Sequence, residues 1–134
     1  NGICLDNNNE NLYIADTKNN KIRKVNLSTG IVSTVITPTL DEPKDVFVDA
    51  NNNLFIADKK NHVIHVVNAA RDSFHVLAGT GSSGDTTDRP AVQTKLDEPS
   101  GITMISAYGG SQIFISDTKN QKIKVLELKT VYGL

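Results

Sequence analysis

The apolar positions of this chain fall in short runs separated by polar turns, with no helical period. Three segments superimpose without gaps, at residues 12–26, 54–68 and 113–127. In each, an apolar-aromatic-apolar run ends at an aspartate, an asparagine follows three residues later, and an isoleucine begins a second run. These positions are Asp16, Asn19 and Ile22, then Asp58, Asn61 and Ile64, then Asp117, Asn120 and Ile123. The pattern predicts a strand, a tight turn and a second strand in each segment.

The repeat extends beyond this hairpin on both sides. Upstream, residues 2–6, 45–49 and 101–105 occupy equivalent places, and the second and third of these follow the same tetrapeptide, Leu-Asp-Glu-Pro. Downstream, two further apolar runs predict a fourth strand in the first two units, at residues 30–36 and 73–78. Turns rich in asparagine separate the first two strands, and in the third unit this turn is predicted to lengthen over residues 106–112.

Four short strands in a repeat of about 40 residues are typical of the blade of a β-propeller, in which several four-stranded sheets surround a channel. Because neighbouring blades pack face to face, both sides of a strand are partly covered, which accounts for the continuous apolar runs. We therefore predict an all-β propeller segment of about three blades. The predicted boundaries are blade one at 1–43, with strands near 2–6, 12–16, 21–26 and 31–36; blade two at 44–98, including a Gly-rich connector at 79–98; and blade three at 99–134, with a truncated outer strand.

These residues resemble the NHL repeat. The resemblance rests on the spacing of Pro-x-Gly-Ile, as in Pro99 to Ile102, and of Leu-Tyr-Ile-Ala-Asp-x-x-Asn-x-x-Ile, as in Leu12 to Ile22, and it covers nearly the whole chain. The connector that begins with residues 79–88 is also similar to a long Gly-rich connector of that family. Two positions depart from the pattern, since Asp45 replaces a glycine and Ser116 replaces an alanine.

The resemblance implies a closed ring of about six blades, of which this chain would supply three. An open arc would leave the apolar blade faces that contain Ile14, Val66 and Phe114 in water, together with unpaired strand edges. We therefore expect the remaining blades to lie elsewhere in a parent chain or in a partner. Symmetric assembly of two such arcs is the alternative.

Composition narrows the classes of function. The chain has 134 residues, with 14 Lys and Arg against 15 Asp and Glu, so its formal net charge of -1 gives no sign of a polycationic nucleic-acid binder. The 38% hydrophobic and 22% charged residues are ordinary for a globular domain. The single cysteine, Cys4, provides neither an internal disulfide nor a Cys-rich zinc site, and no apolar run is long enough to span a bilayer.

The repeated carboxylates are the first candidates for chemistry. Asp16, Asp58 and Asp117 recur at one place in each unit, which sets them far apart around a ring, whereas paired catalytic carboxylates must share one site. Aspartate and asparagine suit tight turns because their short side chains bond nearby backbone amides. We therefore interpret these aspartates, together with Asn19, Asn61 and Asn120, as structural turn residues.

The histidines are the second candidates. By alignment, His62 takes the place of Asn20 and Gln121, and His65 that of Arg23 and Lys124, which we interpret as polar surface positions. Peptide-amidating lyases, which are similar in blade pattern, bind metal with channel histidines from several blades. Here His62, His65 and His75 all fall in one predicted blade, so we expect no metal site, no cofactor and no catalytic residue.

Strand parity predicts one shared surface. In an up-and-down blade, the turn after the second strand and the connector to the next blade lie at the same end, so lysines and connector acids would form a common rim. The candidate interaction rim consists of Lys18, Lys21, Lys59, Lys60, Lys119, Lys122, Asp85 and Asp88. The alternative is that these residues lie in solvent-exposed turns that have no binding role.

The favoured function is a non-enzymatic protein-interaction or scaffold module that docks a protein partner through blade-rim loops, because a rigid repeated frame carries variable loops and no catalytic set. An RNA-binding propeller that uses the lysine-bearing face is a second hypothesis, although aromatic stacking partners are scarce there. A hydrolase or lyase domain of propeller type is a third.

Overall fold

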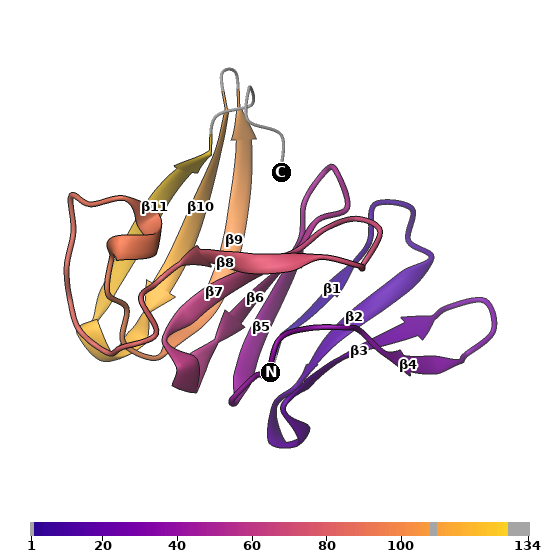
Figure 1. Cartoon of the computed structure of the whole chain (residues 1–134). Helices are drawn as coiled ribbons and strands as arrows, with labels where there is room; N and C mark the ends of the chain where they lie inside the picture. The colour runs from indigo at the N-terminus through magenta and orange to yellow at the C-terminus, as the bar shows by residue number, and fades with distance from the viewer. Residues whose placement is uncertain (1, 108–109, 129–134) are drawn as a thin grey trace.

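The computed structural model describes residues 2–107 and 110–128, and regular structure within them is β-strand apart from short 3₁₀ turns. The strands form antiparallel sheets that stand side by side, as Figure 1 shows. In the described residues there are two four-stranded sheets and one three-stranded sheet, and each strand pairs with its neighbour in the chain. The predicted all-β class is confirmed.

Each sheet comes from one unit of the sequence repeat. Sheet one contains β1 (Ile3–Leu5), β2 (Asn11–Asp16), β3 (Lys21–Asn26) and β4 (Val32–Thr34). Sheet two contains β5 (Pro43–Val48), β6 (Leu54–Asp58), β7 (Val63–Val67) and β8 (Phe74–Ala78). Sheet three contains β9 (Pro99–Ala107), β10 (Gly110–Asp117) and β11 (Lys122–Leu128). The predicted fourth strand of the third unit would involve residues 129–134, which lie outside the described residues.

The turn after the second strand of each sheet is a single 3₁₀ turn. These turns are η1 (Thr17–Asn19), η2 (Lys59–Asn61) and η4 (Thr118–Asn120). The residue after each turn is left-handed, with φ of 56° at Asn20, 56° at His62 and 55° at Gln121. This αL residue closes the turn and reverses the chain into the third strand. The strand, turn and strand predicted from the repeat are therefore present in all three sheets.

The sheets pack face to face through two apolar clusters. The first cluster joins Tyr13 and Ile22 of sheet one to Leu54 and Ile56 of sheet two. The second cluster joins apolar residues of sheet two to apolar residues of sheet three. Its members include Phe55, Ala57, Ile64, Val66, Ile102, Ile113 and Ile115. Because sheet two lies in the middle, every residue of β6 and β7 is buried, which explains their unbroken apolar runs.

The two outer faces of the array are apolar and uncovered. Ile3 of sheet one is 64% exposed and Ile123 of sheet three is 65% exposed. Val66 was expected on such a face but is buried, because sheet three covers it. Exposed apolar faces of this kind fit the expectation that further sheets pack on both sides.

The first hairpin of sheet three differs from its prediction. Residues 106–112 were expected to form a longer turn, but Ser106 pairs with Ser111 and Ile105 pairs with Gln112, so β9 and β10 continue through this region. Small polar residues do not prevent ladder pairing, and here they lengthen two strands that are already in register.

Candidate functional site

The repeated aspartate and asparagine form a clamp at the end of each second strand. In sheet two, Asp58 Oδ2 accepts a hydrogen bond from Asn61 Nδ2 at 2.7 Å. The same bond joins Asn120 to Asp117 at 2.8 Å and Asn19 to Asp16 at 2.9 Å. The spacing of three residues therefore serves local turn geometry in each sheet.

The clamp also holds the segment that leads into its own sheet. Asp58 Oδ1 accepts the backbone N–H of Asp41 at 2.9 Å, and Asn61 Nδ2 donates to the carbonyl of Thr39 at 3.1 Å. In sheet three, Asp117 Oδ1 accepts the N–H of Asp97 at 2.7 Å. Both aspartates of these two clamps are fully buried. The clamps of sheets two and three thus each fix an inter-sheet connector to a turn.

A nitrogen-bearing side chain, Arg, His or Lys, completes each clamp, and the sequence interpretation of this position as a surface position was wrong. Arg23 Nε lies 3.1 Å from Asp16, His65 Nε2 lies 2.9 Å from Asp58, and Lys124 Nζ lies 2.6 Å from Asp117. The His65 side chain is only 7% exposed and that of Lys124 only 10%, so neither is on the surface. A buried carboxylate needs a compensating donor, and this requirement draws the aligned residue inward.

Charge pairing shifts the pKa values of these groups in two of the clamps. The hydrogen bond from Asn19, followed by that from Arg23, lowers the pKa of Asp16. Burial acts to lower the pKa of Lys124, but hydrogen bonds to Asp117 and Asp85 outweigh it and raise that pKa. Both shifts favour the charged forms, as expected for ion pairs.

The other two histidines take different places. His62 is partly buried, and its Nδ1 accepts the backbone N–H of Glu98 at 3.1 Å, so it too helps to hold a connector. His75 lies on β8 and is exposed. The three histidines therefore have different surroundings: His65 contacts Asp58, His62 contacts the Glu98 backbone, and His75 is exposed. In the part of the chain that the structure describes, no group of three or more His, Cys, Asp or Glu residues is placed to hold a metal ion.

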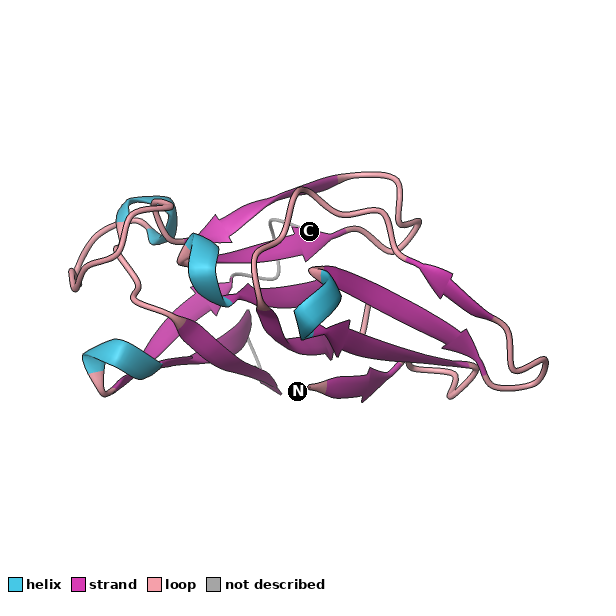
Figure 2. Cartoon of the chain, turned by 90° about the horizontal axis from the view of Figure 1, so that it is seen from below, coloured by secondary structure: helices cyan, strands magenta, loops and turns pink. Residues whose placement is uncertain are grey.

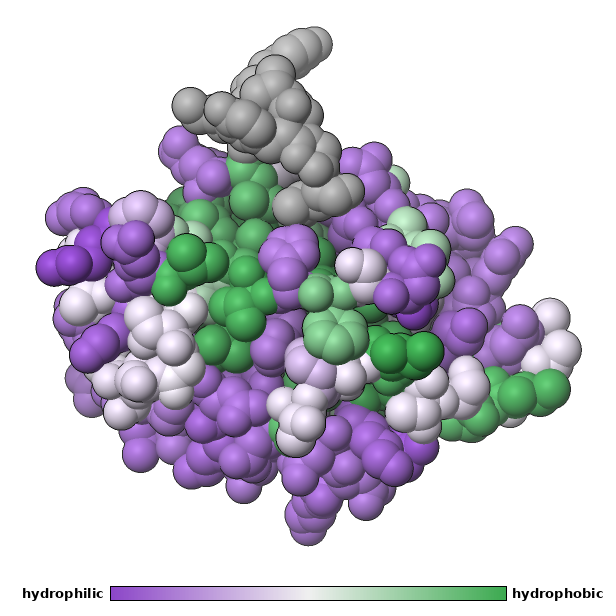
Figure 3. Space-filling model, viewed as in Figure 1, coloured by the Kyte–Doolittle hydropathy of each residue, from purple (hydrophilic) through white to green (hydrophobic). Residues whose placement is uncertain are grey.

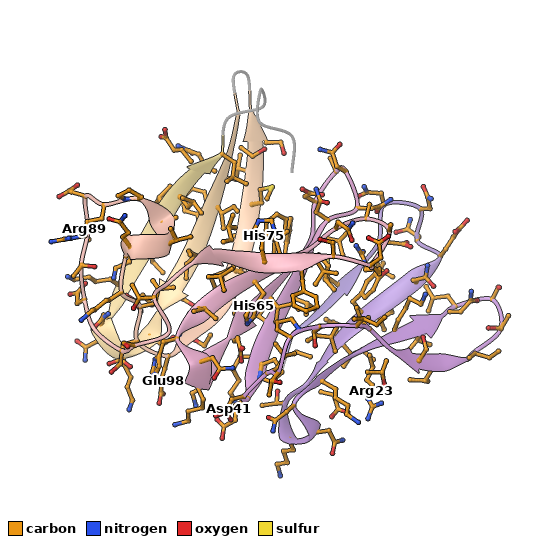
Figure 4. The ribbon with its side chains drawn as sticks, viewed as in Figure 1. Arg23, Asp41, His65, His75, Arg89 and Glu98 are labelled. Atoms are coloured by element: carbon orange, nitrogen blue, oxygen red, sulfur yellow. The ribbon has the colours of Figure 1, made fainter. Side chains whose placement is uncertain are left out.

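Three lysines of the predicted rim converge on one carboxylate. Glu98 lies at the lower end of the molecule in Figure 4 and is largely buried. Lys60 Nζ lies 2.8 Å from it, Lys119 Nζ 3.3 Å and Lys59 Nζ 3.7 Å. The hydrogen bond from Lys60, with that from Lys119, lowers the pKa of Glu98 to about 2 against burial. The same pairing raises the pKa of Lys60.

The remaining rim residues divide between paired and unpaired groups. Lys122 and Lys124 both contact Asp85, and the Lys122 bond, followed by that from Lys124, lowers the pKa of Asp85. Among the described residues, Lys18 and Lys21 of sheet one form no ion pair, and neither does Asp88. The structure therefore brings together five of the eight predicted rim residues, in two clusters centred on Glu98 and Asp85.

Lys18, one of the three unpaired rim residues, borders a hollow of about 380 Å³ between sheets one and two. Its lining consists of Thr17, Lys18, Asn20, Asp41, Glu42 and Lys44. Figure 2 looks from below onto the end of the molecule where the short helical turns lie. The lining contains two lysines and two acids, so the hollow complements a polar surface of mixed charge.

Sequence reasoning missed two contacts between sheets. Arg71 stacks over the ring of Tyr13, with its guanidinium carbon 4.9 Å from the ring centroid, and thereby ties sheet two to sheet one. Asp45 Oδ2 accepts the N–H of Ile102 at 3.0 Å and so bridges the first strands of sheets two and three. The replacement of a family glycine by Asp45 was the one available signal for the second contact.

Repeated four-stranded sheets that pack face to face define a β-propeller array, and comparison with known proteins agrees. The chain has a TM-score of 0.75 with an auxiliary nutrient binding protein from Bacteroides thetaiotaomicron, at 16% identity, over 93% of this chain and 36% of that one. It has a TM-score of 0.59 with streptogramin B lyase, at 18% identity, over 95% of this chain and 40% of that one. The chain therefore has the β-propeller fold and spans part of such a ring.

The sequence is similar to that of an NHL repeat-containing protein. The chain is 29% identical over 141 residues to human NHL repeat-containing protein 2, and the match covers 89% of this chain. It spans only 19% of the length of that relative. No family model matches the chain. Across the described residues, no helix is sufficiently long and apolar to traverse a lipid bilayer.

Proposed function

We propose that this chain is the protein-interaction part of a larger propeller and that it docks a partner through the rim at the η1, η2 and η4 turns. The observation that carries this proposal is that one part of the repeat is constant and another part varies. Clamped aspartates hold the frame of each sheet, whereas the connectors at the same end differ in length and charge and the turns, although equal in length, differ in some of their side chains. A fixed frame with variable loops is the usual arrangement of a binding surface.

The rim favours a protein over a nucleic acid. Lys59, Lys60 and Lys119 all face Glu98, and Lys59 also lies 3.5 Å from Glu42, so two carboxylates offset part of the charge of the three lysines. Lys18 is available beside the acidic residues of the hollow, which gives a surface of both signs. Such mixed charge complements a polar protein surface and would repel phosphates at the acidic positions.

A matched pair of variants tests the rim. The first is Lys18→Gln with Lys21→Gln at the rim; the second is Asn51→Glu with Ser73→Glu at the opposite end, and both change the net charge by the same amount. Each would be immobilised and compared with the wild-type chain for proteins retained from a cell extract by quantitative mass spectrometry. A partner lost only from the rim variant supports the proposal. Equal retention by all three proteins contradicts it.

A salt titration tests the RNA hypothesis. Phosphate contacts release counterions, so binding of an RNA loop would weaken steeply as salt rises. We expect filter binding to show no such slope with the wild-type chain. A steep slope that the Lys18→Gln and Lys21→Gln variant removes would favour RNA instead.

A further inference from the structure

One turn of sheet one contains the acceptor motif for an N-linked glycan. The link from β3 to β4 begins with Asn26-Leu27-Ser28, which has the form Asn-x-Ser with a residue other than proline in the middle. Among the asparagines of the chain, Asn26 is the one that has a serine or threonine two residues later. The sequence therefore singles out one position for this modification.

The serine hydroxyl of the motif is bound to the asparagine side chain. Ser28 Oγ donates to Asn26 Oδ1 at 2.9 Å, and the backbone N–H groups of Ser28 and Thr29 donate to the same oxygen at 3.0 Å each. Hydrogen bonds to the amide oxygen draw electron density from the amide nitrogen, which makes its proton easier to remove. In the part of the chain that the structure describes, Asn26 Nδ2 forms no hydrogen bond, so it is available as the acceptor atom.

The corresponding turn of sheet two provides an internal comparison. The repeat aligns Asn68 with Asn26, and in both turns the asparagine carbonyl and Oδ1 accept backbone N–H groups. Asn68, however, has Ala70 two residues later and so lacks the hydroxyl, and its Nδ2 donates to Asp72 Oδ1 at 2.7 Å. The hydroxyl and the unbound amide nitrogen are therefore particular to sheet one and are not required to make the turn.

The turn lies where a bulky group can be accommodated. Because neighbouring strands are antiparallel, it is at the end of sheet one away from η1, and it projects at the right-hand edge of Figure 1. In Figure 3 no other segment lies in front of this edge. A hollow of about 560 Å³ adjoins the motif, lined by Asn9, Glu10, Asn26, Leu27 and Ser28. A glycan here would leave the rim at the opposite end accessible.

We propose that Asn26 carries an N-linked glycan in the full-length protein. The oligosaccharide comes from a lipid-linked pyrophosphate donor. The bond between sugar C1 and the pyrophosphate oxygen breaks, and its electron pair leaves with the lipid pyrophosphate. C1 bonds to Asn26 Nδ2, and one amide proton passes to a base of the transferase. The proposal implies that the protein enters the compartment that holds this donor, and it does not depend on rim docking.

A glycan at this position would also shield apolar surface. Leu27 and Ile31 of the turn are exposed, and so is Val32 at the start of β4, which is the last strand of its sheet. An exposed apolar strand at a sheet edge can pair with other chains. A bulky hydrophilic group beside that edge opposes such pairing, which gives the modification a physical role at this turn.

Mass spectrometry of the full-length protein, isolated from its own cells, tests the modification directly. Trypsin releases residues 25–44 as one peptide, in which Asn26 is the only asparagine. We expect this peptide to carry the mass of a glycan. Peptide N-glycosidase F, used in water labelled with heavy oxygen, should remove that mass and convert Asn26 to a labelled aspartate.

Variants of the full-length protein, expressed in the same cells, test the motif. Ser28→Ala removes the hydroxyl, whereas Ser28→Thr keeps it. The matched control is Ser33→Ala, which removes the same group from an exposed position of β4 outside the motif. We expect Asn26→Gln and Ser28→Ala to lose the glycan and Ser28→Thr and Ser33→Ala to retain it. Circular dichroism of each purified variant checks that the fold is kept.

Three results would overturn the proposal. One is an unmodified peptide of residues 25–44 from the protein's own cells. Another is a glycan that persists in Ser28→Ala, since the motif would then not be its cause. The third is conversion by the glycosidase only of asparagines other than Asn26.

Discussion

Replacing Asp58 by asparagine tests whether the clamp supports the fold. The substitution preserves shape but turns one carboxylate oxygen into an NH₂ group. Asp58 accepts hydrogen bonds from the Asp41 N–H, Asn61 Nδ2 and His65 Nε2, at 2.9, 2.7 and 2.9 Å, and is fully buried. In either orientation of the new amide, at least one of these donors faces another donor. A change of His65 tautomer does not repair this, because it moves the proton to Nδ1, which is buried and has no partner in the described structure.

The expected cost follows from these contacts. Hydrogen bonds to a charged group are worth about 1.5–3 kcal/mol each, and a buried donor left without an acceptor costs about 1–3 kcal/mol. We therefore expect Asp58→Asn to lower the free energy of unfolding by about 3–5 kcal/mol. With a urea m-value of about 2 kcal/mol/M, the midpoint would fall by about 2 M.

The matched control is Asp16→Asn, at the same place in sheet one. Its side chain is 30% exposed and its partner Arg23 is 29% exposed, so water can replace the lost contacts. Urea unfolding followed by circular dichroism would be compared for the wild-type chain and both variants. A clearly smaller loss is expected for Asp16→Asn. Equal losses for the two variants would refute the argument that burial makes the clamp strong.

The remaining predictions concern other contacts. The pKa of Glu98 is about 2 in the folded chain against an ordinary 4.5, so its stabilising effect is complete above about pH 4.5 and is lost as the pH falls through 2. The stability difference between wild type and Glu98→Gln, measured by unfolding at pH 2 to 7, should therefore vanish at the acid end; a constant difference would contradict this. Gly79 has φ of +97° and an added Cβ would lie 2.4 Å from a backbone carbonyl oxygen, whereas Gly81, at φ +88°, has open space. Gly79→Ala should thus destabilise by about 1–3 kcal/mol more than Gly81→Ala in thermal unfolding, and equal effects would count against the close approach. Arg71→Ala and Tyr13→Leu should show a coupling energy of about 0.5–2 kcal/mol in a double-mutant cycle, and strict additivity would show that the stacking contributes nothing.

The internal repeat was sufficient to predict the strands and turns, because each of them depends on residues that are close together in the sequence. Asp58 and Asn61 belong to one turn, and short apolar runs between polar turns locate the strands within a few positions. The same information could not show that Asp58 reaches back to Asp41, seventeen residues earlier, because that contact depends on how the sheet is assembled. For the same reason the alignment of His65 with Arg23 suggested a surface position.

For the candidate rim, the sequence could predict only that its residues lie at the same end of the sheets. The up-and-down order of the strands places the lysine turns and the connector acids at one end, and the structure pairs Lys60 with Glu98 and Lys122 with Asp85. Strand order gives no distances, so it could not distinguish lysines that form ion pairs from lysines that form none. The hollow between the connector and β11 could not be predicted either. Its two walls come from different parts of the chain, and an alignment of repeats does not show that they lie side by side.

The two connectors explain why junctions between otherwise equivalent sheets can differ in function. Both end at the same clamp, since Asp41 and Asp97 each donate a backbone N–H to a buried aspartate. Residues 79–98 are far longer than the link between sheets one and two, yet both clamps are made. Lengthening a surface loop costs little chain entropy, so the clamp permits insertions without disturbing the packed faces. The extra length supplies η3 and one wall of a hollow of about 290 Å³ whose other wall is β11. The surface at one junction of the array can therefore change while the repeated frame stays the same.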